Sequence, residues 1–294
     1  MSDIESNYDA APLFNDLLDY DDFAGTEEAL AGVKLSSRDS LGRGAFVELM
    51  TQIARFQGLQ GKFEEAQHSL DEAKDHLELD DSTCRVRYLL EQGRLKRSAG
   101  CVEEAVTFFE EAYDCGRSCG EDYHTIDAIH MLAICADGKK SISLGEQAIT
   151  LAEKSGNQFA RNWLGALYNN IGWDCHEQGD FNRALELFNR GLEFRLASGQ
   201  GMATRVAKWS VARALRSLER HREAIEKLYE LEAEWIEANG ESGFVFEELA
   251  ENFNREGNAK AASDYFAKAH KLLKENADVS KERLGRIGRL GKCL

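Results

Sequence analysis

The chain has 294 residues, one proline (Pro12) and a formal net charge of −16. Because proline breaks helices, its near absence favours long helical stretches over a protein of strands and turns. The acidic balance argues against non-specific binding to nucleic acid and to an anionic membrane surface, since both require a basic face.

The sequence also bears on the compartment. No apolar run approaches the roughly 18–20 residues that a membrane span needs, and the opening residues lack the basic and apolar regions of a signal peptide. The seven cysteines are an odd number without a framework of spacings, which suits free thiols in a reducing compartment. We therefore expect a cytoplasmic protein.

Residues 1–42 form the first predicted region, an acidic N-terminal segment with a short helix. Gly25 to Glu28 read as a helix start with acids in the first turn. Residues 11–23 mix acidic and apolar side chains, a composition that suits docking onto a basic groove and competing there with partners. A solubilising tail and a simple N-terminal cap are the alternatives.

Residues 43–275 carry an internal repeat, which has to be identified before any motif because it decides the fold. Turn glycines are followed five residues later by a small residue, and that small position recurs at 66, 105, 145, 184, 224 and 262. Small residues in phase mark close helix–helix crossings, and a globular bundle has no cause to keep such a phase across six units. The pattern predicts an all-α solenoid of about six helical hairpins.

The repeat resembles the tetratricopeptide family. A small residue in the first helix, a turn glycine with an aromatic two residues on, and then alanine and a further aromatic carry this resemblance, best in residues 167–195. The period exceeds the family's usual ~34 residues and is similar to the longer repeats of kinesin light chains and G-protein-signalling adaptors. The resemblance implies a right-handed superhelix, although the family's unit-end proline is missing and the third and fifth units are degenerate.

Residues 276–294 form a basic C-terminal region. Leu284, Ile287 and Leu290 lie on one stripe of a helix and basic residues on another. We expect a capping helix for the array, weakened by its glycines.

The sequence offers no constellation of catalytic residues. The stretch 285–292 is similar to a phosphate loop, but its glycine spacing is wrong and Cys293 stands where serine or threonine is required. Cys115, Cys119 and His124 do not supply the four ligands of a structural zinc site. We therefore expect no enzyme activity, no cofactor and no metal.

In a solenoid of helical hairpins, the first helices line the concave wall. Their inward positions predict a peptide-binding set composed of Arg55, Arg87, Arg94, Arg97, His130, Asn169, Asn170, Trp173, Trp209, Arg213 and Arg216. Arginine forks bind carboxylates, and asparagine can hold an extended backbone from both sides. The resemblance also implies a role for Asn170, which matches the position at which tetratricopeptide proteins use asparagine to bind the main chain of a peptide ligand.

Three functions remain open from the sequence. The preferred one is a non-catalytic adaptor that binds an acidic peptide or helix of a partner protein in its concave groove. The second is a structural subunit of a larger assembly or homo-oligomer that uses its convex face and ends, and an enzyme or enzyme regulator is least favoured. For the arginines, the competing interpretation is a solvated network with glutamates of neighbouring helices.

Overall fold

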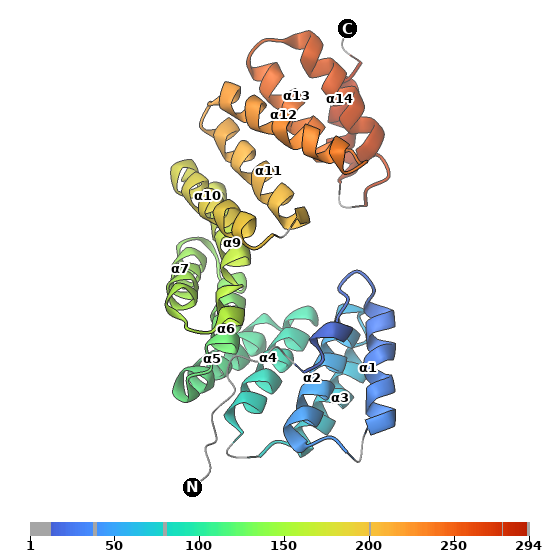
Figure 1. Ribbon diagram of the computed structural model, residues 1–294, viewed down its shortest axis with the longest axis vertical. Coiled ribbons are helices and arrows are strands. Elements are labelled where there is room, and N and C mark those ends of the chain that lie inside the picture. Colours follow the sequence, from blue (N-terminus) through green and yellow to red (C-terminus); the bar gives the residue numbers. More distant parts are fainter. Residues whose placement is uncertain (1–12, 38–39, 79–80, 200, 278, 293–294) are drawn as a thin grey trace. The chain divides into compact units, whose positions relative to one another are not determined.

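The computed structural model describes residues 13–37, 40–78, 81–199, 201–277 and 279–292, and all regular structure in these ranges is helical (Figure 1). Pro12 and Cys293 lie outside the described residues. The chain divides into two compact units, unit 1 (Met1–Leu167) and unit 2 (Tyr168–Leu294). No described helix is both long and apolar enough to cross a membrane.

The described part of unit 1 starts with a 3-10 turn and a lone helix, which precede three helical hairpins and a short connecting helix. Its elements are η1 (Asn15–Leu17), α1 (Phe23–Ser37), α2 (Arg43–Leu59), α3 (Phe63–Asp75), α4 (Ser82–Ser98), α5 (Val102–Cys119), α6 (Asp122–Ile134), α7 (Gly138–Lys154) and α8 (Gln158–Arg161). Helix α1 starts two residues before the expected Gly25, because the Asp22 carboxylate accepts the Gly25 N–H at 2.9 Å and caps the helix there.

Unit 2 continues the hairpins and closes with one further helix. Its elements are α9 (Leu164–Glu177, which begins before the boundary), α10 (Phe181–Ala197), α11 (Gly201–Ser217), α12 (His221–Glu237), α13 (Gly243–Arg255), α14 (Ala259–Leu273) and α15 (Lys281–Leu290). In the described ranges, the predicted all-α array of hairpins with a C-terminal helix is confirmed. Ile287 of α15 is fully buried against α14, as its stripe predicted.

The turn inside four of the hairpins depends on glycine. Gly61, Gly100, Gly179 and Gly257 have φ values of 76°, 83°, 81° and 80°, in the left-handed region that glycine enters without steric cost. The residue after each glycine donates its N–H to a carbonyl five residues earlier, as Lys62 does to Gln57 at 2.9 Å. This is the helix-ending motif that glycine favours, so the repeat pattern in the sequence has a backbone cause.

The degenerate fifth hairpin uses the same turn without glycine. Glu219 has a φ of 60°, and the next residue, Arg220, donates its N–H to Leu215 at 3.0 Å. A left-handed conformation costs a residue with a Cβ roughly 1–2 kcal/mol. The turn therefore keeps its geometry although the sequence lacks the glycine.

Replacing Glu219 by glycine should raise the free energy of unfolding. Part of the left-handed cost is offset because glycine makes the unfolded chain more flexible, so we expect a net gain of about 0.5–1 kcal/mol. Urea unfolding monitored by circular dichroism measures it. Glu226→Gly, at an exposed position inside α12, is the matched control and should lose a similar amount; a loss in Glu219→Gly would contradict the argument.

Candidate functional site

The first helices of successive hairpins lie side by side. In unit 1, α2 contacts α4 and α4 contacts α6, and in unit 2, α11 contacts α13. We call the faces of α2, α4 and α6 the unit 1 wall; of the predicted set, it carries Arg55, Arg87, Arg94, Arg97 and His130. The unit 2 wall is formed by α9, α11 and α13 and carries Asn169, Asn170, Trp173, Trp209, Arg213 and Arg216.

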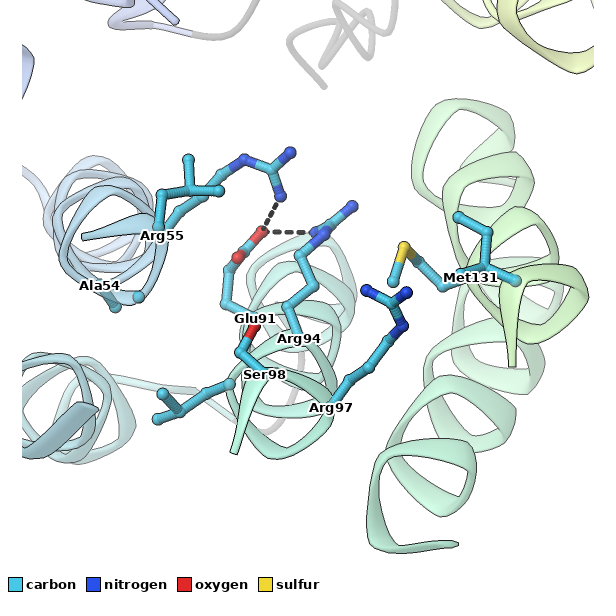
Figure 2. A pocket seen from close by; sticks show the side chains of 11 residues that line it. Ala54, Arg55, Glu91, Arg94, Arg97, Ser98 and Met131 are labelled. Carbon is cyan, nitrogen blue, oxygen red and sulfur yellow. Dashed lines mark hydrogen bonds and ion pairs between the residues drawn. The ribbon is translucent and has the colours of Figure 1, made fainter. Parts of the chain in front are cut away.

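On the unit 1 wall, ion pairs link each first helix to the next. Arg87 of α4 pairs with Glu48 of α2 at 3.1 Å, and both side chains are largely buried. Glu91 reaches between Arg55 and Arg94, with its Oε1 atom 3.5 Å from Arg55 and 2.5 Å from Arg94 (Figure 2). These arginines therefore have carboxylate partners within the protein, as in the network interpretation, but the pairs are largely buried rather than solvated.

The link from α4 to α6 is a buried pair. Both carboxylate oxygens of Asp127, a residue only 6% exposed, accept hydrogen bonds from the Arg94 guanidinium. Burial alone would raise the pKa of Asp127, but the charges of Arg94 and Arg55 outweigh it and hold the pKa below the ordinary 3.8. The pair joins two repeats at the centre of the wall.

Arg97 differs from the other arginines of the unit 1 wall. Its side chain is exposed, and among the described residues it forms no ion pair with a carboxylate. The neighbouring polar group is the Cys135 thiol, whose pKa is raised because burial outweighs the opposing effect of Arg97. Arg97 is thus a cation of this wall that remains available to a ligand.

Two clefts open on the unit 1 wall, and both are lined by Arg55, Glu91 and Arg94. The first has a volume of about 210 Å³ and is otherwise lined by Ala54, Gly58, Leu59, Leu95, Arg97, Ser98, Met131 and Ile134 (Figure 2). The second has a volume of about 230 Å³ and is otherwise lined by Asn15, Leu18, Tyr20, Thr51, Gln52, Arg87, Leu90, Tyr123, His124, Asp127 and Trp163.

The described part of the N-terminal segment lies against this wall. The Leu13 N–H donates to Glu48 at 2.7 Å, and the Tyr20 hydroxyl accepts from Arg55 at 3.2 Å. The Tyr20 ring lies 5.2 Å from that of Phe56. From residue 13 to residue 22, no aspartate pairs with a wall arginine, so these contacts are polar and aromatic rather than ionic. Competition of this segment with a partner stays a prediction.

Buried polar atoms without hydrogen-bond partners are found at both clefts. Within the described chain, Oε2 of Glu91 and Nε1 of Trp163 have none. The centroid of the Trp163 ring lies 6.0 Å from that of Tyr123 and 5.4 Å from that of His130, and His130 is buried and lines neither cleft. One orphan atom is an acceptor and the other a donor, and leaving either unpaired is costly.

The unit 2 wall combines neighbouring aromatic rings with a second charge network. The Trp173 ring lies 5.8 Å from that of Trp209, whose Nε1 donates to the Phe244 carbonyl at 3.2 Å. Arg216 binds the buried Glu248 through two nitrogens. Burial raises the pKa of Glu248 although Arg216 and Arg213 oppose it.

Arg213 is the least compensated arginine of the unit 2 wall. Its Nη1 donates to Ser217 at 2.6 Å and lies 3.3 Å from His176, while its nearest carboxylate, Glu248, is 4.0 Å away. Burial and the neighbouring Arg216 lower its pKa. Burial, followed by Arg213 and Arg216, also lowers the pKa of His176, so this histidine favours its neutral form.

The asparagine pair and the C-terminal helix complete the unit 2 wall. Asn169 donates its amide to Asn170 at 3.2 Å, so the two predicted backbone-binding residues contact each other. Arg283 of α15 binds Glu247 of α13 through two nitrogens, at 3.0 and 2.7 Å. Arg286 of the same helix pairs with Glu251, which ties the capping helix to the wall.

From the sequence we considered glutamates of neighbouring helices as partners of the arginines but did not identify which acids they are. The repeat has a period of 39 residues here, as the equivalent positions of Arg55 and Arg94 show. Glu48 and its partner Arg87 are also 39 positions apart, so an acid one repeat before an arginine of a first helix was a usable signal. Trp163 was missed because it lies in the connection between α8 and α9, outside the repeat pattern. The stretch 285–292, which is similar in sequence to a phosphate loop, is helical through Leu290.

The sequence offers no set of metal ligands, and the positions of the candidate side chains in the structure bear on this. Across the described ranges, no group of three or more His, Cys, Asp and Glu side chains could hold a metal ion. The thiols of Cys115 and Cys119 contact the carbonyls of Ser82 and Gly116. His124 instead lies 3.0 Å from the Glu121 carboxylate, so these three residues do not converge.

No family model and no curated protein matches the chain, but solved structures do. RapI in its apo form superposes with a TM-score of 0.70 at 11% identity, over 89% of this chain and 73% of RapI. A protein from Podosopora anserina, described as a kinesin light chain with TPR-like repeats, gives 0.54 at 18% identity, over 68% and 99%. NprR, solved with its cognate peptide NprX, gives 0.50 at 11%, over 94% and 80%. These likenesses establish the fold.

Proposed function

Because this chain is a tetratricopeptide-like helical repeat protein, we propose that it is a non-catalytic adaptor whose unit 1 wall binds a peptide segment of a partner protein. One observation carries the proposal: the clefts of this wall hold a buried donor, Trp163 Nε1, and a buried acceptor, Glu91 Oε2, that lack partners within the described chain. A peptide backbone offers both an acceptor and a donor at every residue other than proline. Because both atoms are buried, we expect the two side chains to turn toward a bound segment and pair with its backbone.

The charge of the ligand follows from the arginines that have no close carboxylate partner within the described chain. Arg55, Arg87, Arg94 and Arg216 already have carboxylate partners within the protein. We therefore propose that each wall recognises an acidic residue by itself: the unit 1 wall through Arg97, and the unit 2 wall through Arg213, whose ion pair with Glu248 is as long as 4.0 Å. This is a narrower basic surface than the predicted set of six arginines.

The comparisons support a peptide as the ligand class. NprR, which shares the fold, was solved with its cognate peptide bound. On the unit 2 wall, the tilted rings of Trp173 and Trp209, whose centroids lie 5.8 Å apart, offer a separate apolar contact for a peptide. With Asn169 and Asn170 on the same wall, they form the part of the predicted set that we propose acts on peptides without acidic residues.

A second candidate is a structural subunit. Leu196, Met202 and Ile236 lie at ends of α10, α11 and α12, and each is more than half exposed. Exposed apolar groups of this size favour an interface. Sedimentation separates the two candidates. A structural subunit that self-associates should be oligomeric as wild type and lose the oligomer in Ile236→Asp, whereas the adaptor should be monomeric in both forms.

Peptide selection tests the adaptor. Peptides enriched from a phage-displayed random library on the full chain should bind Trp163→Phe more weakly, by about 1–3 kcal/mol, because the variant lacks the N–H that the peptide satisfies. The same variant should be at least as stable as wild type, because it also removes a buried N–H that has no acceptor among the described residues of the free protein. Fluorescence anisotropy with synthetic copies of the peptides and thermal unfolding measure the two effects.

The control is Trp235→Phe in α12, a tryptophan that contacts Arg205 outside the walls; it should leave peptide binding unchanged. Equal affinity of the selected peptides for Trp163→Phe and wild type, or the absence of any enriched peptide, would contradict the proposal.

A further inference from the structure

We propose that the cleft of Figure 2 is a subsite for one bulky apolar side chain of the bound peptide, and that Arg97 holds a carboxylate beside this side chain. The inference rests on the proposed peptide binding and deepens it, because it names the kind of residue that the wall selects.

The floor of the cleft is apolar. Of the apolar residues that form this floor, Leu95 and Met131 are buried, whereas Leu59 and Ile134 are 46% and 41% exposed. Large aliphatic side chains exposed at the ends of two helices, with a hollow of about 210 Å³ between them, leave apolar surface that a ligand side chain can cover. A polar side chain would gain nothing from this floor.

The rim of the cleft is cationic. Arg55, Arg94 and Arg97 line it together with the acid Glu91. Arg55 and Arg94 share Glu91, and Arg94 also binds Asp127, whereas Arg97 has no carboxylate in the described chain. Figure 2 shows Arg97 on the side of Met131, away from the shared Glu91. The uncommitted guanidinium therefore stands next to the apolar floor, and its planar fork suits a carboxylate.

A further polar group of the cleft, the Glu91 carboxylate, constrains the main chain of the ligand. Glu91 Oε2 is buried and accepts no hydrogen bond from the described residues. Any residue other than proline that enters the cleft brings a backbone N–H with its side chain, and that N–H is the donor which Glu91 lacks. The cleft thus matches three features of one peptide segment: an N–H, a large apolar side chain and an adjacent acid.

The depth of the cleft depends on a glycine. Gly58 lies in α2 and lines the cleft, and a Cβ at this position would meet nothing within 4 Å. We therefore expect a larger side chain at this position to occupy part of the hollow. Gly32 of α1 is equally open and does not line either cleft, so it provides a matched control.

The test uses the full chain and peptides enriched from a phage-displayed random library. We expect enriched peptides to carry leucine, isoleucine, methionine or phenylalanine next to aspartate or glutamate. Gly58→Leu should weaken their binding about tenfold or more, whereas Gly32→Leu should not. Both variants should unfold at or above the wild-type temperature, because leucine replaces glycine in an open helical position.

Arg97→Gln tests the second half of the subsite. Wild type should prefer a selected peptide over its copy with asparagine in place of aspartate by about fivefold or more, and Arg97→Gln should lose most of this preference. A merely structural role of Arg97 would weaken both peptides alike. Amidating the peptide C-terminus removes the terminal carboxylate and leaves an internal acid in place. Affinity that survives amidation therefore indicates that Arg97 binds an internal acid.

The outcomes separate the subsite from the peptide-binding proposal. Peptides that bind Gly58→Leu as tightly as wild type but lose affinity for Trp163→Phe would overturn the subsite and leave peptide binding standing. Enriched peptides with lysine or arginine beside the apolar residue, or an unchanged acid preference in Arg97→Gln, would also overturn it. If no peptide is enriched, both proposals fail.

Discussion

Gly93→Leu should reduce the free energy of unfolding by about 3 kcal/mol, the upper end of the usual overpacking cost. A Cβ at Gly93 would overlap the ring of Phe109, which is fully buried within the same hairpin. The ring has no free space to turn into, because protein interiors are packed like organic crystals. Leucine's better helix propensity offsets only about 0.8–1 kcal/mol of the cost.

The fourth hairpin provides an independent repeat of this experiment. Gly172 and Phe188 occupy the corresponding positions, and a Cβ at Gly172 would overlap the Phe188 ring in the same way. Gly172→Leu should therefore lose a similar amount, whereas Gly58→Leu should lose nothing. Chemical denaturation of the three variants makes the comparison, and equal stabilities would show that the small residues do not mark close helix crossings.

Asp127→Ala should cost about 3 kcal/mol at neutral pH, because it leaves the largely buried Arg94 without its principal counter-ion. Glu91 remains bonded to Arg94, which keeps the expected loss at the low end of the roughly 3–5 kcal/mol typical of broken buried pairs. The double variant Arg94→Met/Asp127→Leu removes both charges and should recover most of the loss. A double variant as unstable as Asp127→Ala would mean that packing, rather than charge, stabilises this crossing.

The same pair should give the protein a measurable acid sensitivity. The Asp127 carboxyl has a lower pKa in the folded chain than its ordinary 3.8, so its contribution is complete above the unfolded value and is lost as the pH falls through the folded one. The difference in unfolding free energy between wild type and Asp127→Asn should be constant from about pH 5 to 8 and shrink below about pH 4. A difference that does not change with pH would rule out this assignment.

The hairpins could be predicted because their signals are local. A left-handed turn needs glycine at Gly61, Gly100, Gly179 and Gly257, and the spacing of these glycines sets the lengths of the helices between them. The small residues could be predicted for a similar reason, since a close helix crossing tolerates no larger side chain at Gly93 or Gly172. Glu219 lacks the glycine signal, although its turn has a positive φ and the same hydrogen bond as the glycine turns.

The sequence by itself determined the all-helical repeat, the phase of its units and the set of side chains on the first helices, because each depends on backbone and steric rules that act over a few residues. Only the tertiary structure decided which charges are available. Whether Arg55, Arg87 or Arg94 meets an acid depends on the register between helices one repeat apart, which places Glu91, Glu48 and Asp127 within reach. The same register leaves Arg97 without a carboxylate and Trp163 Nε1 without an acceptor in the described chain, and no local pattern encodes such long-range placement.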